Sequence, residues 1–330
     1  NVLMTVENTD PEVPWLTNWL ETILVQTWYP TTVATMSREV KKIISWYLEK
    51  TGDPSLIDFK LHDFGYRGSS SVESAGIGGC AHLVNFLGTD TLRGIEYADW
   101  YYGADMAGFS IPASEHSTMT SWNGRDGELD AMRNMLDRHP TGLVACVSDS
   151  YDIRNAISEY WGKELKDQIM KRDGTLVIRP DSGDPVSVVL ECCNLIWNRF
   201  GGHVNDKGYK VFDSHVRLIQ GDGIGWKQDP LGNWYHTAGD ILDAMMAEGF
   251  SADNIAFGSG GGLLQDLNRD TQKFAFKCSA SRRNDEYWRD VWKDPVTQQG
   301  KQSKKGRLAL TLDEGKYKTV RLDPSGAMDH

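Results

Sequence analysis

Polar side chains that could bind or transform a ligand recur directly after apolar, extended stretches of this chain. The clearest case is "TLVIRPDSGDP", residues 175–185, where a β-branched run ends in Arg179 and Asp181. An opposite-charge pair at the end of a buried strand predicts a pocket for a polar ligand. The same position after other apolar runs is taken by Asp90, His116, Asp149 and Asp222.

A histidine in "PASEHST" has the composition of a catalytic group. His116 follows an apolar run, Glu115 lies beside it, and we expect Asp149 at the tip of the next strand. A carboxylate beside an imidazole suits a proton carrier or a phosphoryl acceptor. A histidine with only a structural hydrogen bond fits equally well, so both interpretations stay open. The eight histidines show no H-E-x-x-H spacing, and the sequence assigns no metal ligands.

Glycines and basic residues indicate where an anion could bind. In "FGSGGGLLQDL", residues 257–267, glycines separate an apolar run from a helical pattern, so backbone N–H groups there could face a phosphate. A simple tight turn explains the run equally well, and it matches neither a P-loop nor a dinucleotide fingerprint. Asp222 in "IQGDG" could accept hydrogen bonds from a sugar diol or merely form an Asp-Gly turn. The basic residues that could neutralise phosphates are Arg67, Arg179, Arg269, Lys277 and Lys293.

These residues need a scaffold that brings strand ends together. Eight apolar, extended runs alternate with amphipathic helical patterns, which favours parallel α/β architecture. Eight such units predict a (β/α)8-like barrel, whose active face lies at the C-terminal strand ends. A doubly wound parallel sheet is the alternative. The eight runs are 59–68, 81–90, 108–117, 142–152, 175–183, 215–223, 254–262 and 273–280.

Composition limits the class of protein. With 330 residues, 40% of them hydrophobic, the chain can bury a large core. A net charge of −11 argues against a nucleic-acid or anionic-membrane partner. No stretch has the length of a membrane span, the N-terminus has no signal-peptide pattern, and the five cysteines form no C-x-x-C pair, so we expect a cytoplasmic protein with reduced thiols.

The pattern also predicts a domain organisation. Residues 1–54 form a helical, aromatic-rich segment that we expect to cover the barrel or to form a dimer contact. Residues 55–280 would form the α/β barrel with the active site at its strand ends. Residues 281–330 would form a C-terminal extension.

Taken together, these motifs resemble the nicotinamide phosphoribosyltransferases, which are type II phosphoribosyltransferases. The matching segments include "NVLMTVENTDPE", "HDFGYRG", "PASEHST", "VSDSYDI", "IRPDSG", "IQGDG" and "NIAFGSGGGLLQ", in family order across nearly the whole chain. The resemblance begins after the N-terminal part of the family pattern. It implies a type II barrel, a homodimer with shared active sites, phosphoribosyl pyrophosphate as donor with Mg²⁺, and ATP as an optional coupling substrate.

The resemblance also implies roles for individual residues. Phe64 would stack on a pyridine ring, with Arg67 and Arg179 close to the base, and Asp90 would accept a hydrogen bond from the carboxamide. His116 would be the histidine that ATP phosphorylates, and the expected catalytic set is His116, Asp149, Arg179 and Asp181. The residues implied to hold ribose, phosphate or pyrophosphate are Asp181, Gly221, Asp222, Gly260, Gly261, Arg269, Lys277 and Lys293.

Two other functions remain open at this stage. A nicotinate phosphoribosyltransferase shares the barrel chemistry, and Asp90 discriminates because a carboxylate accepts an amide donor and repels a substrate carboxylate. A non-catalytic binding or signalling protein on the same fold is the other alternative, because fold does not fix function. Joint retention of Asp90, His116, Arg179, Asp181 and Asp222 favours the enzyme.

Overall fold

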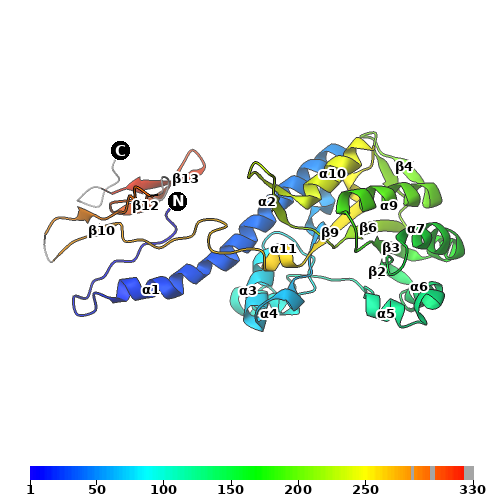
Figure 1. Cartoon of the computed structure of the whole chain (residues 1–330), viewed down its shortest axis with the longest axis horizontal. Helices are drawn as coiled ribbons and strands as arrows, with labels where there is room; N and C mark the ends of the chain where they lie inside the picture. Colours follow the sequence, from blue (N-terminus) through cyan, green and yellow to red (C-terminus); the bar gives the residue numbers. More distant parts are fainter. Residues whose placement is uncertain (284–285, 298–301, 323–330) are drawn as a thin grey trace. The chain divides into compact units, whose positions relative to one another are not determined.

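A computed structural model describes residues 1–283, 286–297 and 302–322. The chain forms two compact units, one made of residues 29–268 and the other of residues 1–28 and 269–330. The larger unit is a mixed α/β structure, drawn with its helices around a central sheet in Figure 1. None of the described helices is long and apolar enough to cross a membrane.

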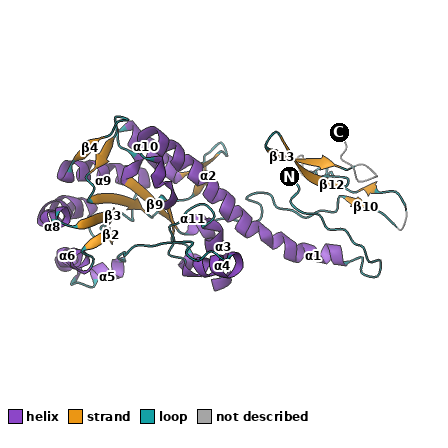
Figure 2. Cartoon of the chain, turned by 180° about the vertical axis from the view of Figure 1, so that it is seen from behind, coloured by secondary structure: helices purple, strands orange, loops and turns teal. Residues whose placement is uncertain are grey.

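The larger unit is built on a curled parallel sheet of five strands in the order β1-β9-β6-β3-β2. Isolated parallel bridges continue it beyond β1: Asp63 pairs with Thr89, Gly88 with Phe109, and Ala113 with Ala145 of β2. The C-terminal strand ends therefore lie at one common end of the sheet (Figure 2). The strands are β1 (Leu61–Asp63), β2 (Thr141–Val147), β3 (Asp173–Arg179), β6 (Val216–Gln220) and β9 (Ile255–Ser259).

The two faces of this sheet differ because side chains alternate along a strand. Leu176 and Ile178 of β3 belong to the large outer core, into which the surrounding helices also pack. Val177 between them faces a small inner cluster with Ala145 and Ile219. Fully burying one aliphatic side chain contributes about 1.5 to 3 kcal/mol, so the outer core fixes strand register.

Four helices supply most of the outer layer: α2 (Trp28–Thr51), α6 (Glu128–Arg138), α9 (Pro185–Phe200) and α10 (Thr237–Ala247). Helix α9 shows how the sequence sets a boundary. Asp184 caps it by accepting the Ser187 N–H at 3.0 Å, and Pro185 occupies its first position. Helix α9 therefore starts soon after Arg179 and Asp181, at the tip of β3.

Short helices and hairpins make up the rest of the larger unit. The helices are α3 (Val72–His82), α4 (Leu92–Tyr102), α5 (His116–Thr120), α7 (Ile153–Asn155), the π-helix η5 (Ala156–Glu164), α8 (Lys166–Met170) and α11 (Gly261–Leu264). The 3-10 turns are η2 (Pro54–Phe59), η3 (Tyr66–Gly68), η4 (Gly124–Gly127) and η6 (Ala252–Asn254). Two hairpins pair β4 (Gly202–Val204) with β5 (Lys210–Phe212), and β7 (Trp226–Gln228) with β8 (Trp234–His236).

The smaller unit contains α1 (Leu16–Leu24), the 3-10 turn η1 (Val25–Thr27) and two hairpins. One hairpin pairs β10 (Ala280–Ser281) with β11 (Arg289–Asp290), and the other pairs β12 (Leu308–Asp313) with β13 (Lys316–Arg321). Glu314 and Gly315 both have positive φ, as a two-residue hairpin turn of the primed type requires.

The predicted parallel α/β architecture is confirmed, but the predicted set of eight strands is only partly observed. Five of the eight runs form the sheet, and the runs at 81–90 and 108–117 contribute only bridges. The prediction of an eighth strand at 273–280 is wrong. Lys273 has a φ of 56°, and only Ala280 of this run joins a strand, which pairs with β11.

The unit boundaries lie at 28/29 and 268/269, whereas the sequence predicted boundaries at 54/55 and 280/281. The first difference has a packing reason. Val40, Ile44 and Leu48 recur at helical spacing along α2 and belong to the core of the larger unit. Helix α2 is therefore part of that core.

A buried lysine connects β1 to the start of β9. Lys60 donates through Nζ to the carbonyl oxygens of Ala252, Asp253 and Ile255 at 2.9, 3.1 and 2.8 Å. We predict that Lys60→Met lowers the free energy of unfolding by about 3 kcal/mol, because it leaves these buried acceptors unpaired. Denaturant unfolding measures the change.

Lys42→Met is the matched control, since Lys42 is exposed and, among the described residues, its ion pair is with Glu39. It should change stability by less than about 1 kcal/mol. Equal losses in the two variants would contradict a specific role for Lys60.

Candidate functional site

The aligned ends of β2 and β3 bring Asp149 and Asp181 together. Val147 is in register with Arg179, and the Ser148 N–H donates to the Arg179 carbonyl at 2.9 Å. Asp149 lies two residues beyond Val147, and Asp181 lies two residues beyond Arg179. Asp149 Oδ2 accepts the Asp181 N–H at 3.0 Å, so the two strand ends are tied together by a carboxylate.

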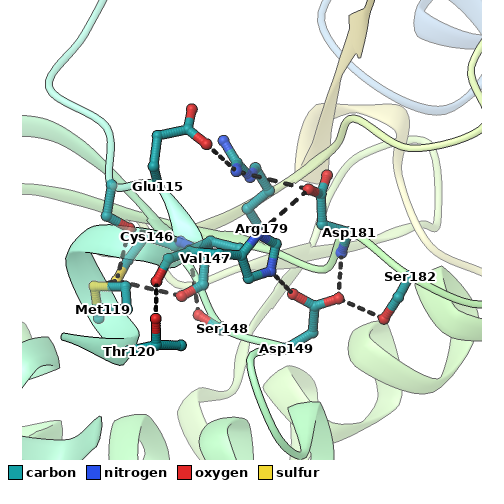
Figure 3. A network of polar contacts seen from close by, with 12 residues as sticks. Glu115, Met119, Thr120, Cys146, Val147, Ser148, Asp149, Arg179, Asp181 and Ser182 are labelled. Carbon is teal, nitrogen blue, oxygen red and sulfur yellow. Dashed lines mark hydrogen bonds and ion pairs between the residues drawn. The ribbon is translucent and has the colours of Figure 1, made fainter. Parts of the chain in front are cut away.

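Asp149, shown with Asp181 and Ser182 in Figure 3, also pairs with the candidate catalytic histidine. His116 is the first residue of α5, and its Nε2 lies 2.9 Å from Asp149 Oδ1. Burial opposes ionisation of Asp149, but hydrogen bonds from Ser182, His116 and the Asp181 N–H outweigh it and hold its pKa below the ordinary value. An ionised Asp149 fixes the imidazole of His116 through Nε2. The other ring nitrogen of His116, Nδ1, lies 4.0 Å from Asp181 Oδ2.

A row of side chains with alternating charge begins at Asp181, beside the His116–Asp149 pair. Arg179 Nη2 lies 3.7 Å from Asp181 Oδ2 and 3.7 Å from Glu115 Oε2, and Arg67 Nη1 lies 3.9 Å from the same Glu115 oxygen. Burial raises the pKa of Asp181; Arg179 lowers it and nearby Asp149 raises it. The structure thus brings together Arg179 and Asp181, which the sequence analysis selected, and adds Glu115, which it did not include as a site residue.

A second carboxylate site lies at the end of β1. Asp90 Oδ1 accepts from Ser110 Oγ at 2.5 Å and lies 2.8 Å from His62 Nε2. Burial opposes ionisation of Asp90, but the bonds from His62 and Ser110 hold its pKa below the ordinary value. Asp90 is therefore an anionic acceptor at neutral pH. Sequence reasoning missed His62 and Ser110, although both lie inside the runs it selected.

Glycines make room for Phe64 beside these carboxylates. A side chain at Gly258 would place its Cβ 1.9 Å from the Phe64 ring. At Gly221, a Cβ would lie 3.2 Å from the same ring and 3.3 Å from Asp181 Oδ1. Gly260 approaches the Phe64 carbonyl, and Gly261 begins α11. The end of β1 thus contacts the ends of β6 and β9, with Phe64 next to Asp181.

Asp222 follows Gly221 at the tip of β6. Its carbonyl oxygen accepts from Gln220 Nε2 at 2.9 Å, which holds the turn. Burial is the main reason that the pKa of Asp181 is raised, and Asp222 contributes in the same direction. The structure therefore places both Asp149 and Asp222 within electrostatic reach of Asp181.

Comparison with known proteins identifies the family of this site. The model of the nicotinate phosphoribosyltransferase (NAPRTase) family matches residues 59–323, which include all of these strand ends. This chain belongs to the nicotinate phosphoribosyltransferase family. The predicted class of enzyme, a phosphoribosyltransferase, is confirmed.

Relatives within this family carry the more specific name. The chain is 54% identical over 329 residues to a nicotinamide phosphoribosyltransferase of Xanthomonas campestris, covering 98% of this chain and 68% of the relative. Proteins of the same name from Acinetobacter baylyi and Mycoplasma pneumoniae are 36% and 34% identical, each over 93% of this chain and over 63% and 67% of the relative. The predicted resemblance is confirmed, and the chain spans about two thirds of the length of these relatives.

Three predicted phosphate ligands of this family member lie in the smaller unit. Arg269 pairs with Asp270 at 3.3 Å, Lys277 is exposed, and Lys293 donates its N–H to Ser303 Oγ at 2.9 Å. Because these three residues lie outside the larger unit, the geometry of its strand ends does not test their roles. Their assignment to phosphate or pyrophosphate stays a prediction.

A buried glutamate within electrostatic reach of Asp149 was not predicted from the sequence. Glu128, the first residue of α6, is 3% exposed, and no described residue forms a hydrogen bond with its Oε1. Burial, with smaller contributions from Asp152 and Asp149, raises its pKa from 4.5 to about 7. The Glu128 carboxyl is therefore partly protonated at neutral pH.

This glutamate should make stability depend on pH. Between pH 4.5 and 7 the unfolded chain releases the Glu128 proton while the folded chain retains it, so its contribution to stability falls as pH rises. We predict that Glu128→Gln gains stability relative to the wild type by on the order of 2 kcal/mol between pH 4 and pH 8. Denaturant unfolding at both pH values measures this.

The exposed Glu248 at the end of α10 provides the control, Glu248→Gln. Its difference from the wild type should stay nearly constant over the same range because the carboxylate is solvated. A constant difference for Glu128→Gln as well would show that Glu128 is already ionised in the folded protein.

Proposed function

We propose that this protein transfers the 5-phosphoribosyl group from phosphoribosyl pyrophosphate to nicotinamide, giving nicotinamide mononucleotide and pyrophosphate in NAD salvage. The observation that carries the proposal is Asp90, an anionic acceptor at the end of β1, whose partner His62 lies beside Phe64. The names of the relatives support the same substrate.

Asp90 favours nicotinamide over nicotinate. A carboxamide can donate an N–H to this carboxylate, whereas the carboxylate of nicotinate would face a like charge. Nicotinate is thus the second candidate, supported by the family description alone. A purely non-catalytic role would leave the fixed pair of His116 and Asp149 unexplained.

In the proposed complex, Phe64 stacks on one face of the pyridine ring and Arg179 borders the base. Asp181, with Gly221 and Asp222, holds the ribose. The backbone N–H groups of Gly260 and Gly261 receive the 5′-phosphate at the start of α11. Close packing of Gly221 and Gly258 against Phe64 supports this placement, because it joins the base wall to the strand ends assigned to ribose and phosphate.

The chemistry needs alignment more than proton transfer. The pyridine nitrogen has no proton to lose, so attack on the anomeric carbon requires no general base. Asp181 and Asp222 can counter the positive charge that develops on the ribose. Arg179 and Arg67, balanced by Glu115 when no substrate is bound, supply positive charge beside the carboxylates.

Magnesium fits this site as a companion of the donor. The described residues contain no group of three metal-ligating side chains, but Asp149 and Asp222 both act electrostatically on Asp181. Mg²⁺ commonly uses one or two carboxylates together with substrate phosphates, which this set could provide. When bound, the ion would neutralise charge on the leaving pyrophosphate.

His116 is the proposed phosphoryl acceptor for ATP. Its imidazole is fixed by Asp149 through Nε2, while the histidine side chain is 43% exposed. Phosphorylation would leave the transfer chemistry unchanged, since that step needs no base, and would couple ATP to product formation.

We also propose that the curled sheet is the barrel of a type II phosphoribosyltransferase. The bridges that run from β1 through 88–89 and 109–113 to β2 support this assignment. A homodimer with shared active sites and a cytoplasmic location both stay predictions from the sequence.

The first functional prediction concerns Asp90. Asp90→Asn removes the negative charge but keeps the shape, so the preference for nicotinamide over nicotinate should fall by about tenfold or more. Each base is assayed separately with saturating phosphoribosyl pyrophosphate. Asp130→Asn is the control, because Asp130 is exposed and, in the part of the chain that the structure describes, its ion pair is with Arg133 on α6. An unchanged base preference in Asp90→Asn would remove the reason for choosing nicotinamide.

The second functional prediction concerns His116. His116→Ala should abolish ATP hydrolysis and stimulation by ATP while leaving measurable transfer without ATP, because the transfer step needs no base. Product formation with and without ATP measures both effects. Retention of full ATP stimulation would assign the phosphoryl acceptor to another residue.

A further inference from the structure

One oxygen of Asp90 is held twice and the other is left free. Oδ1 accepts from Ser110 Oγ and pairs with His62 Nε2. Within the described part of the chain, no hydrogen bond is made to Oδ2. If Asp90 only filled space, it would not need two donors on the same oxygen. This asymmetry fixes the rotation of the carboxylate and leaves one defined acceptor.

The fold places His62 to act on Asp90. His62 lies on β1 between the buried residues Leu61 and Asp63, so its side chain points to the opposite, inner face of the curled sheet. Its partner across the ladder is Gly258, which has no side chain. Gly88 also makes room, since a Cβ there would lie 2.7 Å from His62 Nδ1.

The same imidazole contacts the proposed base wall. The ring centroids of His62 and Phe64 are 5.1 Å apart, at an interplanar angle of 52°. The backbone holds the other end of the arrangement, because the Asp90 N–H donates to the Asp63 carbonyl at 2.9 Å. His62 is therefore joined to both groups proposed to bind the pyridine ring.

We propose that His62, assisted by Ser110, is a positioning residue that sets base specificity by holding Asp90 Oδ1 and directing Oδ2 at the substrate carboxamide. This inference rests on the proposed function. His62 itself does not contact the reacting atoms. Its effect passes through the orientation of Asp90, because a carboxylate free to rotate would lose alignment with a single amide N–H.

Paired variants separate the hydrogen bond from the packing of the ring. His62→Gln retains a donor at a similar distance from the backbone, whereas His62→Leu retains bulk without a donor. At the second donor, Ser110→Thr keeps the hydroxyl and Ser110→Ala removes it. All four variants are made in the full-length protein. KM and kcat are measured for nicotinamide, nicotinate and phosphoribosyl pyrophosphate.

We expect His62→Leu to raise the KM for nicotinamide on the order of tenfold and to lower its preference over nicotinate, because a hydrogen bond to a charged group is lost. The KM for phosphoribosyl pyrophosphate should change little. His62→Gln and Ser110→Thr should recover most of the preference. In an Asp90→Asn background, His62→Leu should have almost no further effect on the KM for nicotinamide or on base preference, because the effects of coupled residues are not additive.

His215→Leu is the matched control. His215 Nδ1 also pairs with an aspartate, Asp213, at 2.6 Å, but it directly precedes β6 at the opposite end of the sheet. Base preference should stay at the wild-type value in this variant.

Two failures can be told apart. Wild-type protein that makes no nicotinamide mononucleotide would overturn the proposed function. An active wild type with unchanged base preference in His62→Leu would overturn only the role of His62. So would equal losses in His62→Leu and His62→Gln, or additive effects with Asp90→Asn.

Discussion

The parallel register of β2 and β3 is the constraint on which the rest of the site depends. The two strands pair over seven positions, from Thr141 with Asp173 to Val147 with Arg179. Side chains alternate along a strand, so a slip by one residue would turn Arg179 from the inner face to the outer core. It would also separate Asp149 from the Asp181 N–H. The buried outer core excludes that slip, since Leu176 and Ile178 would then face the wrong side.

Within this frame, two neighbouring aspartates acquire different properties. Three hydrogen bonds hold the pKa of Asp149 below its ordinary value against the effect of burial, whereas burial raises the pKa of Asp181. The difference arises because the backbone N–H of Asp181 and the Ser182 hydroxyl both donate to Asp149. Asp149 is thereby committed to holding His116, whereas Asp181 remains beside Arg179.

This acidic chain concentrates positive charge at the strand ends, next to carboxylates. The net charge is −11, yet Arg179 is nearly buried among Asp181 and Glu115, so positive charge is local and balanced. Phosphates that compete with these carboxylates would gain guanidinium contacts already in place. Gly221 and Gly258 have no side chains, and this leaves room for the Phe64 ring beside Asp181.

The sequence alone determined the parallel α/β class, the family, and which strand ends carry polar residues, because apolar periodicity and local motifs are properties of adjacent residues. It did not determine the pairings among those ends. Glu115 lies between two arginines, and His62 and Ser110 share one oxygen of Asp90; these contacts join residues far apart in the chain, so only tertiary packing decides them. Tertiary packing also buries Glu128 and leaves its Oε1 without a hydrogen bond from the described residues. The run at 273–280 shows the converse: its alternation suits a strand, but strand pairing needs a neighbour, and only Ala280 finds one in β11.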